Sequence, residues 1–253
     1  MEETTSIRQF SIDQTFSEAW VLTKKHFLVF LALTILIFLI GSIPSGSQYA
    51  DYVKLLMENG GTMTEEMLMA TAGPVAQIKT SIATIICSII QSYFVLVLYR
   101  LTNDAVKGAD VNLADRLKGG IHGFIFYLLT SFALSISIFI GTLACIIPGI
   151  FLGVRLWFAP IIAALHPERS FGDCFDQSWK MTKGHFWKLL LLGIVLILLN
   201  ILGLMCCCVG VVVTSIISYF VTIIAYRTLS GEAEEKEEKA EDFTSDNLTI
   251  VSE

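Results

Sequence analysis

The amino-acid sequence predicts an all-α, polytopic membrane protein with six transmembrane helices in three hairpins, which short amphipathic interfacial helices precede or join. Of the 253 residues, 54% are hydrophobic and only 16% are charged, with a mean hydropathy of +0.69. Soluble domains are about 25% charged. The apolar runs reach the length of about 20 residues that a helix needs to cross hydrocarbon. A repeated unit of amphipathic segment and hairpin is the third observation behind this fold class.

The first expected span covers residues 27–43 and is closed by Pro44. An amphipathic helix precedes it, in which Trp20 would lie at headgroup depth and Lys24 would face lipid phosphates. The leader of 26 residues contains acidic side chains and is too long for the charged start of a signal peptide. We therefore expect this span to remain in the membrane as an anchor.

Charges, prolines and glycines set the bounds of the other spans. The run Gly123–Leu165 has 43 residues, too many for one crossing, and Pro148 divides it because proline suits the first turn of a helix. A second long run, Leu189–Tyr226, has 38 uncharged residues and reverses near the cysteines at 206–208. Residues 44–78 would form the outer loop. The six expected spans are residues 27–43, 79–99, 123–145, 148–165, 186–205 and 208–227.

Charge divides the chain into a transmembrane domain, residues 1–229, and an acidic tail, residues 230–253. The tail carries nine acidic residues and two lysines, and this composition predicts disorder. Fourteen of the seventeen lysines and arginines lie near the N-terminus, in the turns at 100–122 and 166–188, and at the C-terminus. The positive-inside rule then places both termini in the cytoplasm and the chain in the inner or plasma membrane as a multi-pass protein.

An internal repeat relates the start of the chain to its last third. Moving the sequence by 159 positions aligns residues 11–27 with residues 170–186, and seven of the seventeen positions are identical. The identical pairs are Ser11/Ser170, Phe16/Phe175, Trp20/Trp179, Thr23/Thr182, Lys24/Lys183, His26/His185 and Phe27/Phe186. We interpret the repeating unit as an interfacial helix followed by a hairpin. Such repeats are common in transporters, and any duplicated hairpin would leave the same pattern.

Arg155 is the strongest candidate for a functional residue because it lies inside an expected span. A charged side chain at the centre of a membrane helix costs roughly 2.5–3.5 kcal/mol and usually has a partner. Counting residues along the helices places Arg155 near the depth of Asn200. One interpretation is a structural hydrogen bond between these two side chains. The other is a site for an anionic group such as a lipid phosphate.

The residues around Arg155 in the sequence extend this candidate site. Arg169, Lys183 and His185 would add positive charge beside an anionic lipid or solute. Trp179 and Trp187, like Trp20 and Lys24, are expected to anchor the protein in the interface.

The sequence argues against metal, cofactor and catalytic chemistry. None of the six expected spans contains an acidic residue, and no hydrolase, Walker or dinucleotide-binding motif is present, so we predict no catalytic residue. The six cysteines lack zinc-site spacing, and the histidines that start three spans, at 26, 122 and 185, have no accompanying carboxylate. We predict no metal, no cofactor and, without a basic stripe, no nucleic-acid partner.

The stretch IPGIFLGVRLWFAPIIA, followed by SWKMTKGHFWKL, resembles the membrane domain that is fused to some bacterial glycerophosphoryl diester phosphodiesterases. It also resembles related uncharacterised six-helix bacterial membrane proteins. The residues that carry the resemblance are Pro148, Gly149, Arg155, Pro160, Ser178, Trp179, Thr182, Lys183, Gly184, Phe186 and Trp187. The family's catalytic barrel would need its own soluble domain, and this sequence contains none. The resemblance therefore implies a membrane module linked to lipid metabolism and no phosphodiesterase activity.

Two functions of different class follow from these observations. The first is a non-enzymatic module that binds membrane lipids, including anionic ones, or scaffolds a membrane or cytoplasmic protein partner. The alternative is a transporter or permease that moves a small or anionic solute along the interface between the repeats. Solute flux would favour the alternative, and a co-purifying anionic lipid without flux would favour the first.

Overall fold

The computed structural model describes residues 10–58, 60–62, 65, 73–119, 123–205 and 207–231. Within these ranges the chain is all-α, and six helical segments are long and apolar enough to cross a membrane, which confirms the predicted fold class. The acidic tail from residue 232 onward, Cys206 and His122 lie outside the described residues.

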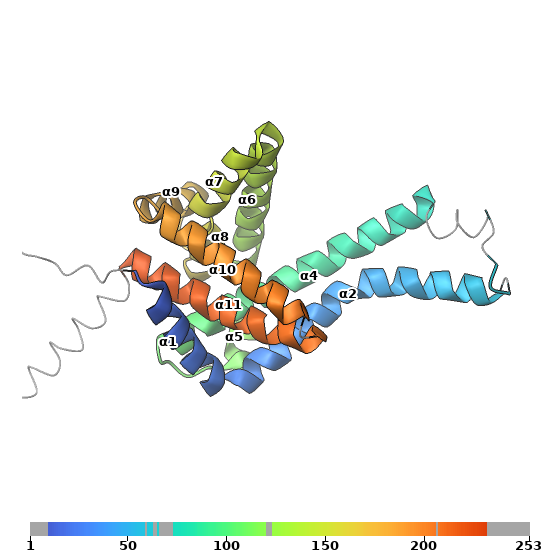
Figure 1. Ribbon diagram of the computed structural model, residues 1–253, viewed down its shortest axis with the longest axis horizontal. Helices are drawn as coiled ribbons and strands as arrows, with labels where there is room; N and C mark the ends of the chain where they lie inside the picture. The colour runs from blue at the N-terminus through green and yellow to red at the C-terminus, as the bar shows by residue number, and fades with distance from the viewer. Residues whose placement is uncertain are drawn as a thin grey trace, which may run out of the picture.

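The spans form three hairpins that diverge from a common base (Figure 1). They are α2 (Phe27–Glu58) with α4 (Pro74–Val106), α6 (Phe124–Ala144) with α7 (Ile146–Arg155) and α8 (Ala159–Leu165), and α10 (Phe186–Met205) with α11 (Cys207–Ser230). Three shorter helices precede or connect them: α1 (Ile12–Lys25), α5 (Leu113–Gly119) and α9 (Phe171–Met181).

Helix α11 is the centre of the core. It packs against α1, α2, α4 and α10, and its residues Ile216, Phe220 and Tyr226 are completely buried. The ring of Phe220 lies 4.8 Å from that of Phe30 on α2, and the ring of Tyr226 lies 6.1 Å from that of Phe158. Away from this core the spans expose mostly leucine, isoleucine and phenylalanine, as a surface that faces lipid must.

The first hairpin is more helical than the sequence analysis predicted. The expected end of the first span at Pro44 is wrong, because α2 runs through Pro44 to Glu58, and the expected outer loop at 44–78 is helical over residues 44–58 and 74–78. Serine hydroxyls supply extra hydrogen bonds around the proline: Ser42 donates to the Leu39 carbonyl at 2.8 Å and Ser47 donates to the Pro44 carbonyl at 2.9 Å. Neither bond involves the Ile40 carbonyl, which the proline leaves without its helical donor.

The far ends of α2 and α4 extend beyond the length that hydrocarbon requires. Helix α2 has 32 residues, which is about 48 Å at a rise of 1.5 Å per residue, against a hydrocarbon core of about 30 Å. Its last turns carry Asp51, which pairs with Lys79 of α4 at 3.4 Å. The polar segment after Pro44 is therefore a helical extension of the hairpin.

The fourth span, expected as one helix at 148–165, is broken between α7 and α8. Proline 160 has no N–H to donate to the Leu156 carbonyl, and the Ala159 N–H binds that carbonyl instead, at 3.1 Å. In a continuous helix the Ala159 N–H would bind the Arg155 carbonyl. The Arg155 carbonyl is thus left without its helical donor, and it accepts a hydrogen bond from the Ser178 hydroxyl of α9 at 2.9 Å.

The second span, expected at 79–99, continues to Val106 and contains an acidic residue. Asp104 is only 7% exposed, and Arg116 of α5 donates to its two oxygens from Nε at 2.6 Å and from Nη2 at 2.8 Å. The neighbouring Asn103 accepts from Arg227 of α11 at 3.3 Å. The expected span at 79–99 itself contains no acidic residue, but α4 continues beyond it and carries Asp104, whose buried carboxylate is made tolerable by Arg116 of α5.

Close backbone contact holds the tips of two hairpins together. A Cβ atom on Gly149 of α7 would lie 2.9 Å from the Cα atom of Thr142 on α6. Similarly, a Cβ atom on Gly203 of α10 would lie 2.9 Å from the Gly210 carbonyl oxygen of α11. Small residues are the usual means by which membrane helices approach each other this closely.

The paired groups at the end of α4 give a stability prediction. Asp104→Asn removes the partner of Arg116 and should lower the free energy of unfolding by about 1–2 kcal/mol, measured by thermal unfolding in detergent. Asp176→Asn is the matched control, because Asp176 and its partner Lys180 are 60% and 74% exposed. The control should change stability by less than about 0.5 kcal/mol. Equal effects of the two substitutions would contradict the structural role of the buried pair.

Candidate functional site

The side chain of Arg155 is held by aromatic rings at the end of α7. Its guanidinium carbon lies 5.3 Å from the ring centroid of Phe151 and 5.2 Å from that of Trp179 on α9. Cations at this distance from an aromatic face are attracted by the ring quadrupole. The Nε and Nη1 atoms are buried and have no hydrogen-bond partner among the residues that the structure describes. Two donor atoms of a cation are therefore without an acceptor in that part of the chain.

Asn200 lies elsewhere, and the predicted hydrogen bond between Arg155 and Asn200 is wrong. The Asn200 amide nitrogen donates to the Leu196 carbonyl at 2.8 Å and to the Ser218 hydroxyl at 3.0 Å, and its oxygen accepts from Thr214 at 3.1 Å. These bonds join α10 to α11.

The depth assigned to Arg155 from the sequence is also wrong. Its neighbour Phe151 packs against Phe186, the first residue of α10, with ring centroids 5.4 Å apart. Asn200 follows fourteen residues later, which is about 21 Å further along the same helix. The Arg155 guanidinium, beside Phe151 and Trp179, therefore lies near the start of α10 and not at the level of Asn200.

The other basic residues of the predicted site flank α9. Arg169 is half-buried in the turn before this helix, whereas Lys183 is exposed in the turn after it. His185, directly before α10, is half-buried, and its buried Nδ1 atom has no partner within the described ranges. Thr182 connects this turn to the broken span, since its hydroxyl lies 3.3 Å from the Arg155 carbonyl. The structure thus gathers Arg155, Lys183 and His185 around one end of α9.

The predicted interface anchors are all partly exposed. Trp20 on α1 is 48% exposed, and the Lys24 ammonium lies 4.8 Å from its ring. Trp179 is 39% exposed and contacts Arg155 on one side, while Trp187 at the start of α10 is 78% exposed. Trp179 therefore combines an exposed edge with a cation contact.

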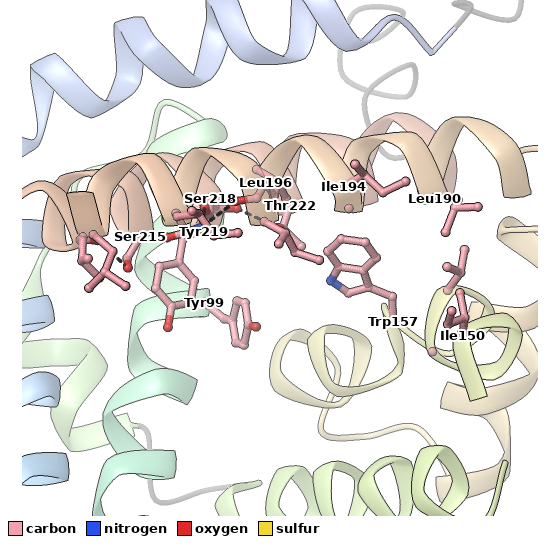
Figure 2. Close-up of a pocket in the computed structure, with 18 residues that line it drawn as sticks. Tyr99, Ile150, Trp157, Leu190, Ile194, Leu196, Ser215, Ser218, Tyr219 and Thr222 are labelled. Carbon is pink, nitrogen blue, oxygen red and sulfur yellow. Dashed lines mark hydrogen bonds between the residues drawn. The ribbon is translucent and has the colours of Figure 1, made fainter. Parts of the chain in front are cut away.

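A cleft of ≈ 810 Å³ lies between α7, α10 and α11 (Figure 2). Its walls are mainly apolar: Ile150 and Val154 come from α7, and Leu190, Ile194 and Ile197 come from α10. The volume falls within the range of about 300–1,000 Å³ that is typical of small-molecule sites.

Polar side chains form a strip along the α11 wall of this cleft. Ser215, Ser218 and Thr222 line it, and each donates its hydroxyl hydrogen to a carbonyl one turn earlier, at 2.7, 2.8 and 2.7 Å. The hydroxyl hydrogens are therefore all used within α11, and the hydroxyl oxygens can only accept hydrogen bonds from a molecule in the cleft. Tyr99 of α4 lies beside Tyr219 at this end of the cleft, with ring centroids 5.6 Å apart (Figure 2).

Trp157, in the break between α7 and α8, forms another part of the cleft wall (Figure 2). Its ring approaches Gly193 of α10 so closely that a Cβ atom there would lie 2.9 Å from Cζ3 of the indole. Replacement of Gly193 by a larger residue would therefore displace the indole and change the shape of the cleft.

Sequence reasoning missed the charged network at the end of α4. Asn103 and Asp104 follow Arg100 at spacings of three and four residues, which places all three on one side of a helix. That spacing was the available signal, and it was overlooked because the span was expected to end at Arg100. No partner for Arg116, in the turn at 100–122, is predicted from the sequence. A second pocket, of ≈ 320 Å³, lies at this network.

Within the described ranges, no three His, Cys, Asp or Glu side chains gather in a way that could hold a metal ion. Cys174 on α9 is buried, and burial raises the pKa of its thiol. A buried thiol with a raised pKa is a poor nucleophile at neutral pH.

Ser178→Ala tests the attachment of α9 to the broken span. Loss of the hydrogen bond to the Arg155 carbonyl should cost about 1 kcal/mol, which is roughly fivefold faster amide exchange in α9. Hydrogen–deuterium exchange with mass spectrometry measures this rate. Ser135→Ala is the control, because the Ser135 hydroxyl bonds only within its own exposed helical turn. Unchanged exchange in α9 would contradict the attachment.

Comparison with known proteins adds no assignment to this geometry. No protein-family model, curated protein or solved structure matches the chain. The resemblance to the membrane domain of glycerophosphoryl diester phosphodiesterases stays a prediction from the sequence motif, and the function is argued below from the site itself.

Proposed function

We propose that this chain is a non-enzymatic lipid-binding module of the membrane and that the cleft between α7, α10 and α11 holds a lipid acyl chain. The observation that carries the proposal is the cleft itself, at ≈ 810 Å³ with walls of isoleucine, leucine, valine and tryptophan. An unfilled space of this size would forfeit dispersion contacts along its whole lining. In a bilayer the apolar chain that is available to fill it belongs to a lipid.

The polar strip does not conflict with an apolar occupant. Burying a hydroxyl group is costly when its hydrogen bond is unmade. The hydroxyls of Ser215, Ser218 and Thr222 keep their hydrogen bonds within α11. A methylene chain can therefore lie against this wall at little cost.

The headgroup of an anionic lipid would bind outside the acyl-chain cleft, at Arg155. The buried Nε and Nη1 donors of Arg155 have no acceptor in the described structure, and a phosphate oxygen is a suitable one. His185 and the exposed Lys183 would add donors and charge on the same side of α9, and Arg169 would add charge before it. The aromatic faces of Phe151 and Trp179 keep the guanidinium in place.

We also propose that the chain lies in the inner or plasma membrane with both termini in the cytoplasm. The six spans make the protein multi-pass, and an even number of crossings returns the chain to its starting side. The positive-inside rule selects the cytoplasm because the basic residues cluster on the side of the termini. The charged network of Arg100, Arg116 and Arg227 belongs to this side in the proposed orientation.

Lipid binding without catalysis agrees with the residue types on the sequence. The stretch that resembles the phosphodiesterase membrane domain lies entirely in α7 to α10, and its His185 has no carboxylate beside it in the sequence as a catalytic base would. A membrane or cytoplasmic protein partner that uses the lipid-loaded module is part of the same proposal.

Transport is the second candidate function, and the polar strip favours it. Asn200, Ser215, Ser218 and Thr222 place polar side chains along the cleft, as a path for a small solute requires. Flux of a small solute into liposomes that contain the protein would support this candidate, and lipid retention without flux would support the first.

Ile197→Trp tests the acyl-chain site. Ile197 lines the cleft and is 61% exposed, so an indole there should occupy the space and lower the amount of co-purified lipid severalfold. Native mass spectrometry of the detergent-extracted protein measures the bound lipid. Leu202→Trp on the same helix is the control, because Leu202 is 59% exposed and is not part of the cleft lining.

Arg155→Gln tests the headgroup site in the same experiment, and it should reduce the anionic fraction of the retained lipid. Lipid retention that is identical in the wild type, Ile197→Trp and Arg155→Gln would refute the proposed function.

Accessible cysteines test the proposed orientation. Cys145, at the junction of α6 and α7, is exposed, whereas Cys174 on α9 is buried. In cells that express a variant whose only cysteine is Cys145, a membrane-impermeant maleimide should label the protein from outside. A variant whose only cysteine is Cys174 should remain unlabelled. Labelling of Cys145 only after the cells are opened would reverse the assigned topology.

A further inference from the structure

Three aromatic side chains that carry hydrogen-bond donors line one part of the acyl-chain cleft. They are Tyr99 of α4, Tyr219 of α11 and Trp157, in the break between α7 and α8. The centroids of the two tyrosine rings lie 5.6 Å apart, and the rings are inclined by 76°. Figure 2 shows the indole nitrogen, in blue, on the edge of the Trp157 ring that is turned toward the two tyrosines. The three donor groups therefore surround one part of the cleft.

Packing fixes the direction of these rings. The Cζ3 and Cη2 atoms of Trp157 abut Gly193 of α10, where an added Cβ atom would lie 2.9 and 3.2 Å from them. The nitrogen Nε1 is on the opposite edge of the indole, so it points away from α10. Tyr99 contacts the rings of both Tyr219 and Tyr127, at 5.6 and 6.5 Å between centroids. Donors that are held in place lose less entropy when they bind a ligand.

The three donors are unused in the part of the chain that the structure describes. The hydroxyls of Tyr99 and Tyr219 and the Nε1 atom of Trp157 form no hydrogen bond with any residue there. Unpaired donors inside a membrane are costly, because hydrocarbon offers no acceptor. A plain hydrocarbon chain in the cleft would leave this cost in place, whereas a chain that carries an accepting oxygen would remove it.

The other polar side chains that line the cleft have already used their hydrogens. The Asn200 amide nitrogen donates to the Leu196 carbonyl and to the Ser218 hydroxyl. The hydroxyls of Ser215, Ser218 and Thr222 donate within α11. The donors that a ligand can use are therefore those of the three aromatic rings, and they favour a ligand that accepts hydrogen bonds.

The lining also limits the charge of this ligand. No charged side chain is among the described residues that line the cleft. An anionic acceptor would enter an apolar site without a counter-charge, which costs more than neutral hydrogen bonds return. The acceptor is therefore a neutral group, and a carbonyl oxygen, with two lone pairs, can accept from two of the donors at once.

We infer that the cleft binds a membrane quinone, with a ring carbonyl oxygen at the donors of Tyr99, Tyr219 and Trp157. A quinone is neutral, its carbonyl oxygens only accept hydrogen bonds, and its flat ring can pack against aromatic side chains. Its apolar tail would lie along the isoleucine and leucine side chains of α10. The volume of ≈ 810 Å³ accommodates a ring and a tail, since small-molecule sites measure about 300–1,000 Å³.

The position of the donors along α10 distinguishes a quinone from the ester groups of a glycerolipid. Trp157 abuts Gly193, seven residues after Phe186 at the start of α10, which is about 10 Å along the helix. The Arg155 guanidinium lies near Phe186. The ester groups of a glycerolipid are next to its phosphate, so a lipid with its phosphate at Arg155 would have its ester carbonyls short of the three donors.

This inference rests on the proposed function, because it requires an apolar chain in the cleft. It deepens that function by assigning the chain to a neutral lipid. The Arg155 site, outside the cleft, would then hold a different and anionic lipid. The test below uses a probe without carbonyl groups, so that failure of the quinone site can be distinguished from failure of the cleft itself.

Removal of the two phenol oxygens is the decisive substitution. The double variant Tyr99→Phe/Tyr219→Phe keeps both rings and removes both hydroxyl donors. Tyr127→Phe is the matched control, because the Tyr127 ring lies 6.5 Å from that of Tyr99 and does not line the cleft. The full chain in neutral detergent is tested with radiolabelled decylubiquinone and with radiolabelled decylbenzene, which has the same tail and no carbonyl. Scintillation proximity measures the binding of both probes.

We expect saturable binding of decylubiquinone, weakened roughly tenfold or more by the double variant and less than about twofold by Tyr127→Phe. Decylbenzene uses only the apolar walls, so its weaker binding should be the same in the wild type and the double variant. Equal affinity of the wild type for the two probes, or equal losses of decylubiquinone binding in the two variants, would overturn the quinone and leave the acyl-chain site intact. Absence of binding for both probes would overturn both.

A further pair of probes separates the two sources of a carbonyl group. Phosphatidylglycerol with ester-linked chains has carbonyl oxygens that its ether-linked counterpart lacks, and native mass spectrometry counts the adducts of each lipid. Equal retention of the two lipids would support the quinone. A preference for the ester-linked lipid that the double variant abolishes would assign the three donors to acyl esters and overturn the inference.

Discussion

The missing N–H of Pro160 determines how the second half of this protein is arranged. In hydrocarbon a backbone carbonyl without a donor is expensive, and no water is available to replace the lost partner. The Ala159 N–H donates to the Leu156 carbonyl, so the carbonyl of Arg155 needs a donor from outside its own helix. It finds the hydroxyl of Ser178. One proline thus divides the fourth span and attaches α9 to the division.

This attachment also explains where the charge of Arg155 resides. Because α9 docks at the break, Trp179 covers the guanidinium together with Phe151, and Phe186 at the start of α10 packs on Phe151. The cation consequently lies beside the junction of three helices. Helix α9 therefore supplies both the hydrogen-bond donor for the Arg155 carbonyl, from Ser178, and an aromatic ring for its guanidinium, from Trp179.

The number of spans was predictable because it depends on the length of apolar runs, which is a local property of the sequence. The ends of the spans were less predictable, since they depend on partners that are distant in sequence. Helix α2 continues through Pro44. Helix α4 continues through Asp104, and the carboxylate of Asp104 is paired with Arg116 of α5. Pattern reasoning placed both residues in loops. A proline or a carboxylate is read correctly only when its tertiary partners are known.

The candidate site divides in the same way. Arg155 could be singled out from one sequence, because an isolated charge in an apolar run is conspicuous. Its aromatic partner Trp179 and the distance of Asn200 depended on the break after α7. The cleft could not be anticipated at all: its walls come from three helices, and it exists because the hairpins diverge (Figure 1). Residue patterns do not encode such an opening.

The position of Trp157 has an optical consequence. The chain has four tryptophans, and Trp157 alone among them lines the cleft. The wavelength of its fluorescence emission depends on the polarity around the indole. A brominated acyl chain bound in the cleft would quench this fluorescence by contact. The molecule therefore contains an intrinsic fluorophore whose signal follows occupancy, with no dye attached.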